Sequence, residues 1–198
     1  HAELLEWPRV NPGPCPYPPP PGFTGSVFVR EVLYSVSGGY ENVPLAFSQE
    51  AFDELTPALY AELQDLEASL WRSGETYPQD SNELNQLFAD GEGDFTMTYG
   101  PATLTQLVAD GTYPAGTKVL TLDEGTVGNA SFLGLASTSG SKAGAMVVAN
   151  LSLSAEQQAA KAQPDVWGQF TVLDLDQLSD EQRALFEALP SSPVVPAY

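Results

Sequence analysis

Asp94-Phe95-Thr96-Met97-Thr98-Tyr99-Gly100-Pro101 is the stretch on which the fold prediction depends. Phe95, Met97 and Tyr99 alternate with small polar residues, which is the two-residue period of a β-strand. After Gly100-Pro101 the apolar residues recur with the period of a helix. The sequence therefore predicts a strand that runs directly into a helix.

This junction is also the first candidate binding site. A strand that enters a helix through Gly-Pro directs backbone N–H groups outward, beside the positive end of the helix dipole. In open α/β sheets, ligands bind at this edge. Tyr99, Gly100 and Pro101 are therefore candidate ligand-binding residues.

A second helix start lies near the N-terminus, at Phe23-Thr24-Gly25-Ser26. The following residues, 27–36, have an amphipathic helix pattern, and Thr24 or Ser26 can act as its N-cap. Phe23, Thr24, Gly25 and Ser26 are candidates because hydroxyls and first-turn N–H groups suit a polar or anionic ligand.

Further strand patterns lie on either side of Gly125-Thr126-Val127-Gly128-Asn129, which we interpret as a hinge. The segment 117–122 suggests a strand, and 131–136 suggests a buried one. A short apolar segment follows at 170–174. Strands that alternate with helices predict an α/β fold with a partly parallel sheet.

Helix signals are frequent along the rest of the chain. Residues 1–7 suggest the end of a helix stopped by Pro8, and Thr56-Pro57 suggests a helix that restarts. The leucines at 59, 63, 66 and 70 define a core face, and Trp71 is expected to pack there. The expected N-terminal caps are Ser48, Asp80, Ser154 and Ser179, with a further helix that starts at 139–142.

Composition limits the partners of the chain. It has 26 acidic and 7 basic residues in 198, a formal charge of −19, so nucleic acid and anionic lipid are poor partners. The acidity itself suits a solvated surface in salty surroundings. The single cysteine, Cys15, is interpreted as a loop thiol within a proline-rich run at 11–22.

No catalytic motif emerges from the sequence, and we expect neither an enzyme nor a bound metal or cofactor. The only histidine is His1, so a Ser-His-Asp triad lacks a base. The Ser139 to Lys142 stretch resembles a Ser-Lys pair, but it also fits a helix cap. The acidic residues at 90, 92 and 94 lack the glutamate that completes a calcium loop.

Several segments, taken together in order, resemble extracellular solute-binding proteins of ABC importers, in the family-1 group related to thiamine, iron and polyamine binders. The segments are Asn11-Pro12-Gly13, Tyr17-Pro18, Phe23 to Ser26, the Gly-Thr-Val-Gly-Asn hinge, Lys142 to Asn150, Leu153 to Gln157 and Trp167-Gly168. The likeness covers nearly the whole chain, which looks like the C-terminal half of a longer member.

This resemblance implies a periplasmic-binding-protein-like (type II) three-layer lobe with a mixed sheet, plus the C-terminal part of a second lobe. The expected divisions are a connector at 1–20, a complete lobe at 21–125 and the hinge with the other lobe at 126–198. The implied function is capture of a small solute between lobes and its delivery to ABC permease subunits. The implied location is the periplasm or another extracytoplasmic space of a bacterium, with a signal peptide in the precursor.

By position, the resemblance adds Thr126, Gly128 and Asn129 at the crossing to the candidate ligand-binding residues. Each candidate also has a simpler interpretation. Thr24 and Ser26 can be plain caps, Tyr99 a core aromatic, and Gly128-Asn129 a turn.

Two alternatives remain for the function of the chain. One is a protein-interaction or scaffold module, and the other is a hydrolase or transferase with paired carboxylates.

Overall fold

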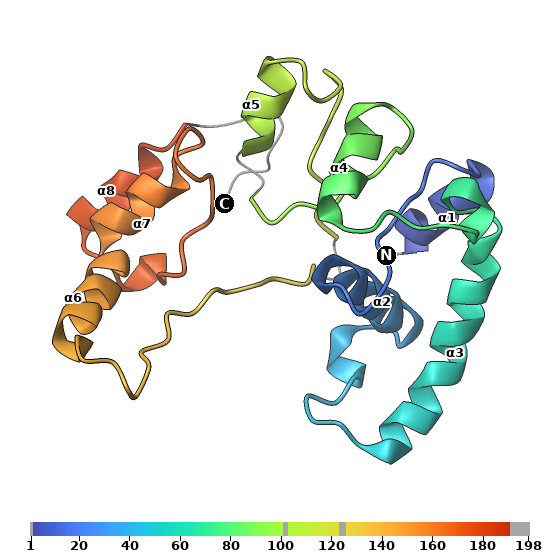
Figure 1. Ribbon diagram of the computed structural model, residues 1–198, viewed down its shortest axis with the longest axis horizontal. Coiled ribbons are helices and arrows are strands. Elements are labelled where there is room, and N and C mark those ends of the chain that lie inside the picture. The colour runs from blue at the N-terminus through green and yellow to red at the C-terminus, as the bar shows by residue number, and fades with distance from the viewer. Residues whose placement is uncertain (1, 101–102, 123–125, 191–198) are drawn as a thin grey trace. The chain divides into compact units, whose positions relative to one another are not determined.

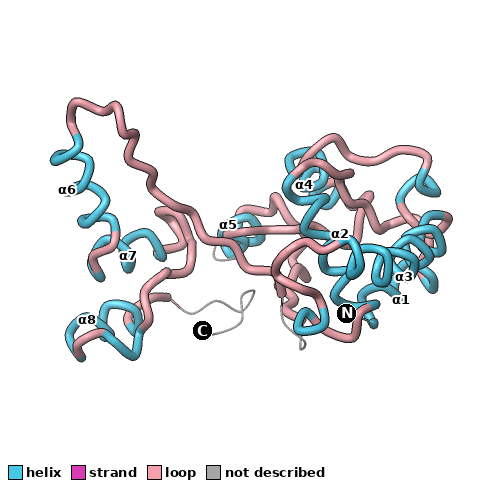
Figure 2. Tube along the Cα trace, turned by 90° about the horizontal axis from the view of Figure 1, so that it is seen from below, coloured by secondary structure: helices cyan, strands magenta, loops and turns pink. Residues whose placement is uncertain are grey.

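The structure, a computed structural model, describes residues 2–100, 103–122 and 126–190. In these ranges every regular element is a helix, and Figure 2 draws loops between them. The chain divides into two compact units. Unit 1 comprises His1–Met97 and Leu120–Val127, and unit 2 comprises Thr98–Val119 and Gly128–Tyr198.

Unit 1 is built on the packing of α2 against α3 (Figure 1). Its elements are α1 (Ala2–Val10), α2 (Phe23–Val36), α3 (Gln49–Glu67) and α4 (Ser81–Ala89), with short 3-10 helices at Tyr40–Asn42 and Trp71–Gly74. Val32 of α2 contacts Leu59 and Leu66 of α3 in the core, together with Leu5 of α1. The leucine face of α3 is thus buried because three helices share one apolar cluster.

The proline-rich run fills a second small core in unit 1. The ring of Tyr17 stacks on Phe28 of α2 with 4.1 Å between centroids, beside buried Cys15 and Leu70. The Trp71 backbone N–H donates to the Cys15 carbonyl at 3.3 Å. Trp71 itself is buried, as the sequence predicted. The run is therefore an extended segment held against helices.

Unit 2 contains a small core between its last helices. Its elements are α5 (Thr103–Ala109), α6 (Lys142–Ser152), α7 (Ala155–Ala162), a short 3-10 helix at Leu175–Gln177 and α8 (Asp180–Glu187). Ala155 and Ala159 of α7 pack on Phe186 of α8. Small residues on one helix let the other approach closely, and Leu173, Leu175, Leu178 and Leu189 pack around this cluster.

The predicted helix caps are confirmed by hydrogen bonds. The Ser48 side chain accepts from the Ala51 N–H at 3.1 Å, and Asp80 accepts from two N–H groups of α4. Ser154 caps α7, and Ser179 forms a complete capping box with Gln182. These signals are local, so sequence alone located them well.

Three expectations about helix boundaries are wrong. Pro8 lies inside α1, and Pro57 lies inside a continuous α3, because an interior proline removes one hydrogen bond without ending the helix. Neither Thr24 nor Ser26 caps α2. The helix begins earlier, at Phe23, with Gly22 as an N-cap that makes no side-chain hydrogen bond.

The predicted α/β fold, with a type II lobe and a mixed sheet, is also wrong for the described residues. None of the segments 94–99, 117–122, 131–136 and 170–174 forms a strand. A strand needs a neighbouring backbone with matching donors and acceptors. Period-two patterning indicates which residues suit an extended chain, but it cannot supply that neighbour.

Two of these segments show the reason in detail. The Asp94 N–H donates to the Pro14 carbonyl at 2.7 Å, but the neighbouring chain is rich in proline, which has no N–H to return to a ladder. The segment 131–136 is exposed along its whole length, so the expected buried strand is wrong as well.

Candidate functional site

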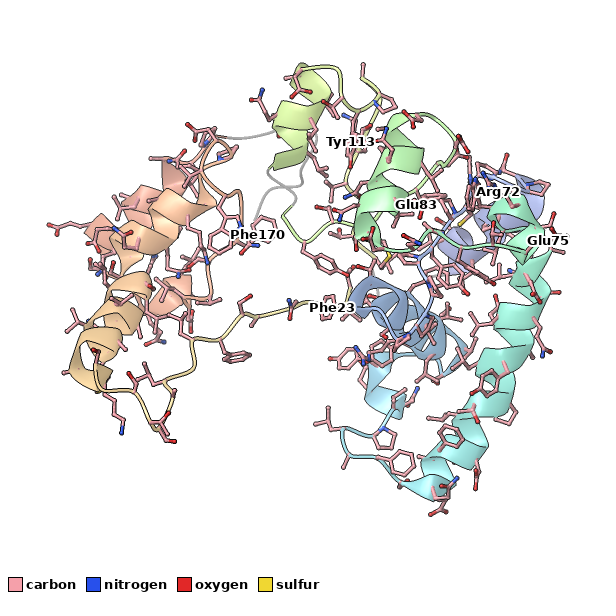
Figure 3. All side chains as sticks on the ribbon, in the orientation of Figure 1. Phe23, Arg72, Glu75, Glu83, Tyr113 and Phe170 are labelled. Carbon is pink, nitrogen blue, oxygen red and sulfur yellow. The ribbon has the colours of Figure 1, made fainter. Side chains whose placement is uncertain are left out.

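The best-defined candidate site is the start of α2. Thr24 is 4% exposed, and its hydroxyl oxygen lies 2.5 Å from the hydroxyl oxygen of Ser81, the first residue of α4. Phe23 is 57% exposed, and Figure 3 shows its ring at this end of α2, pointing away from α3. Two helix starts far apart in the sequence therefore meet through a hydroxyl pair beside an exposed ring.

Gly25 allows this arrangement because α2 begins directly against the proline-rich run. A Cβ atom built on Gly25 would lie 2.6 and 2.7 Å from the backbone carbonyl atoms of Pro19, and it would also meet the Pro18 carbonyl oxygen. No side chain fits there, so Gly25 serves packing at the helix start. Ser26 is half-buried, and its N–H donates to the Gly22 carbonyl at 2.9 Å.

The two helix starts differ in how they are capped. At α4, Asp80 accepts from the N–H groups of Asn82 and Glu83 at 2.8 and 3.0 Å. At α2, Gly22 offers no side chain, so no side-chain oxygen of the cap residue occupies the positive end of the helix. The start of α2 thus differs from that of α4 in having no side-chain cap, while the carbonyl groups of Pro18 and Pro19 lie against it.

The crossing segment is attached to the same helix. The Val127 N–H donates to the Glu31 carboxylate of α2 at 2.5 Å. Burial raises the pKa of Glu31, and the hydrogen bond from Val127 acts in the opposite direction. The Thr126 hydroxyl accepts from the Leu122 N–H at 2.9 Å, and both residues belong to unit 1.

The remaining candidates belong to unit 2. Tyr99 is 39% exposed, which does not fit the core aromatic interpretation. The Gly100 N–H donates to the Thr98 hydroxyl at 3.3 Å. Gly128 and Asn129 are exposed in an extended segment with no turn. Pro101 and Gly125 lie outside the described residues.

Sequence reasoning missed Ser81 and Glu31 as parts of this region. The start of α4 at Ser81 was recognisable from its cap, but 57 residues separate it from Thr24, and no local signal joins the two. Glu31 is an ordinary acidic residue in an amphipathic helix pattern. Its link to Val127 spans 96 residues and depends on the fold alone.

Reactive chemistry is poorly represented in the described ranges. They hold no group of three or more His, Cys, Asp or Glu side chains that could bind a metal ion. Cys15 is 7% exposed, and burial together with the nearby Asp94 raises its pKa to about 11. At neutral pH this residue is a protonated thiol and a poor nucleophile. No helix in the described part of the chain has the length and apolar character needed to cross a bilayer.

Comparisons with known proteins give one informative relative. The chain is 35% identical over 180 residues to Protein YnjB of Escherichia coli (strain K12), a match that covers 91% of this chain and 46% of that protein. The chain thus spans about half the length of the curated relative it matches. No family model matches it. No solved structure gives a significant match either.

These findings contradict the identification as an ABC solute-binding protein of the family-1 group. That identification implied lobes built on a mixed sheet, and the described residues contain helices without strands. The name of the relative, Protein YnjB, states neither a ligand nor a transport role. The function must therefore be argued from the site.

Proposed function

We propose that the chain is a non-catalytic, solute-binding component of a membrane importer, with a small polar solute held at the start of α2. The observation that carries the proposal is the pair of hydroxyls on Thr24 and Ser81, 2.5 Å apart, at a helix start that has no side-chain cap. The solute site in this proposal rests on that geometry, and the importer role is the expectation drawn from the sequence.

The chemistry of the α2 start supports a polar solute. Hydroxyls can donate or accept, and the helix dipole favours partial negative charge on the bound group. The exposed ring of Phe23 offers a flat apolar surface beside them. Small-molecule sites commonly combine a few polar groups with an aromatic wall.

The surroundings of this region favour binding over reaction. Glu31, the carboxylate of α2 that holds Val127, accepts a backbone hydrogen bond, which is a structural role. Cys15 is a protonated thiol in the second core of unit 1.

In this proposal the partner that receives the solute is a membrane permease, and the protein works outside the cytoplasm of a bacterium.

A thermal-shift screen tests the proposal. It uses the protein purified from the cells that naturally make it. The panel contains thiamine, polyamines, ferric citrate, phosphonates and sugars, added after refolding to strip any ligand carried through purification. A solute present at 100 times its Kd stabilises by about 2.7 kcal/mol, which raises the melting temperature by a few degrees. If no solute in the panel raises it, the proposal fails.

A second candidate, a protein-interaction module, is favoured by a different observation. Large apolar side chains between residues 126 and 153 are exposed, among them Phe132 and Val147. Such a surface suits a protein partner. This candidate predicts a stable protein complex together with no response to any solute, so the same screen separates the two.

A further inference from the structure

Residues 126–153 are poor in charge for such an acidic chain. Charged residues make up 17% of the sequence, but Lys142 is the only one in this segment. The segment is nevertheless exposed nearly throughout. Solvated surfaces of an acidic protein carry charge, and the buried centre of an interface is depleted in it. The composition is that of a covered surface.

The helix within this segment is apolar on most of its circumference. Met146, Val147 and Val148 of α6 are all more than half exposed. Because successive helical residues are about 100° apart, these three side chains span roughly 200°. A helix that is apolar on so many sides belongs to an interior, and α7 contacts α6 without burying any of its residues.

The backbone N–H groups of the extended residues 130–136, before α6, lack a partner among the described residues, while the Ala136 carbonyl accepts from the Ser139 N–H. None of the backbone N–H groups of residues 130–136 donates a hydrogen bond to a backbone carbonyl of the described residues. Phe132 is 90% exposed, and Leu133 and Leu135 are also exposed. Backbone groups in an apolar surface need partners, and a neighbouring strand supplies donors and acceptors together.

We propose that residues 126–153 are covered by polypeptide equivalent to the part of Protein YnjB outside the matched region, which pairs a strand with 131–136 and packs on α6. The match covers 46% of that protein, so the relative contains polypeptide beyond it that could form such a layer. The covering surface is apolar and uncharged, to complement a segment with one charge. This inference does not depend on which solute the protein binds.

Photocrosslinking identifies the occupant. Phe132 is replaced by the photoreactive residue p-benzoyl-phenylalanine in the protein as its own cells make it, and the crosslinked peptide is sequenced. The proposal expects a peptide that aligns with Protein YnjB outside the matched region. A crosslink to a second copy of residues 1–198 or to an unrelated protein overturns the proposal. The absence of any crosslinked peptide overturns it as well.

Hydrogen exchange and matched variants provide a second, independent readout. Two preparations are compared, the isolated 198-residue chain and the protein purified from the cells that naturally make it. In the second, the amides of 131–136 should exchange more slowly by a factor on the order of 100. Val147→Asp abolishes this protection, whereas Leu45→Asp, at a fully exposed apolar residue of unit 1, leaves it unchanged. Equally fast exchange in both preparations contradicts the proposal, as does protection that grows with the concentration of the isolated chain.

Discussion

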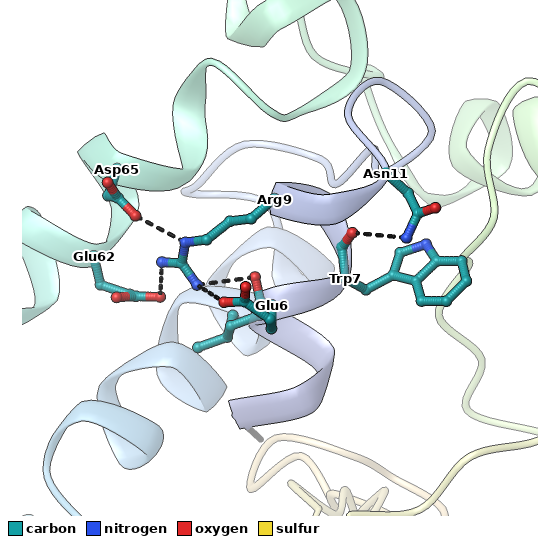
Figure 4. Close-up of polar contacts among 7 residues, drawn as sticks. Glu6, Trp7, Arg9, Asn11, Glu62 and Asp65 are labelled. Atoms are coloured by element: carbon teal, nitrogen blue, oxygen red, sulfur yellow. Dashed lines mark hydrogen bonds and ion pairs between the residues drawn. The ribbon is translucent and has the colours of Figure 1, made fainter.

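Arg9 is the residue that joins α1 to α3 by charge. Its guanidinium donates to Glu62 at 2.7 Å and to Asp65 at 2.8 Å, both on α3 (Figure 4). Glu6, on its own helix, lies 3.4 Å away. The pKa of Arg9 is raised above that of an ordinary arginine, mainly by the hydrogen bond to Glu62. The Arg9 and Glu62 side chains are only 26% and 22% exposed, so water weakens this ion pair less than the pair with Asp65, which is 66% exposed.

Arg9→Met should therefore destabilise unit 1 by about 1–3 kcal/mol, since it removes charge-assisted hydrogen bonds and leaves two carboxylates adjacent. Urea denaturation measures the loss. Arg30→Met, at an exposed arginine of α2, is the control and should change the free energy of unfolding by less than about 0.5 kcal/mol. Equal effects of the two substitutions would contradict this role of Arg9.

Cys15 gives a pH-dependent prediction. Burial raises its pKa from 9.0 to about 11, so at pH 8 the folded protein holds roughly 100-fold less thiolate than the unfolded chain. Alkylation by iodoacetamide should follow an apparent pKa near 11 in the folded protein and near 9 in guanidinium. The raised pKa also means that stability contributed by the neutral thiol declines as pH rises from about 9 to 11. Identical pH profiles in the two states would refute the buried thiol.

At the scale of elements, two helical glycines make opposite predictions. Gly25→Ala places a methyl group against the backbone of Pro18 and Pro19, which cannot rotate away. Despite the higher helix propensity of alanine, unit 1 should lose about 1–3 kcal/mol. Gly144, in α6, has no atom within 4 Å of an added Cβ, so in the isolated 198-residue chain Gly144→Ala should stabilise by up to about 1 kcal/mol. Thermal unfolding of both variants tests the contrast, and a shared sign would count against the packing at Gly25.

Two serine caps form a second matched pair. Ser179 accepts from the Gln182 N–H at 3.2 Å, whereas Ser141, the N-cap of α6, makes no side-chain cap bond. Ser179→Ala should therefore cost about 1 kcal/mol, and Ser141→Ala close to nothing. Guanidinium titrations followed by circular dichroism measure both values. A larger loss for Ser141→Ala would show that the caps are wrongly assigned.

The elements that sequence predicted correctly share a local cause. The caps at Ser48, Asp80 and Ser179 act within three residues, so the sequence around each contains the whole signal. The strand predictions failed because pairing depends on distant backbone. The segment at 131–136 has an apolar pattern but lies exposed and unpaired. The helix pattern of α2 was recognised, but its start was placed at 27 instead of Phe23, and the contact of Thr24 with Ser81 was not predictable.

At the scale of the whole molecule, charge separates two kinds of surface. Most of the chain is acidic, in keeping with a net charge of −19, while residues 126–153 carry the single charge of Lys142. We infer that the acidic part faces solvent and that the uncharged part faces protein. The proposed solute site belongs to unit 1, where Thr24, Ser81 and Glu31 lie. The two proposals therefore concern different parts of the chain and can fail separately.

Isothermal titration of the solute found in the thermal screen tests the central claim most directly. Thr24→Val removes the hydroxyl that faces Ser81, and Thr56→Val makes the same change in α3, where the hydroxyl donates to the Phe52 carbonyl at 2.7 Å. Ser81→Ala serves as a second test should Thr24→Val fail to fold. The proposal predicts affinity weakened on the order of 10-fold by Thr24→Val and by Ser81→Ala, with Thr56→Val binding as tightly as the unmodified protein. Unchanged affinity in folded Thr24→Val and Ser81→Ala would contradict a solute site at the start of α2.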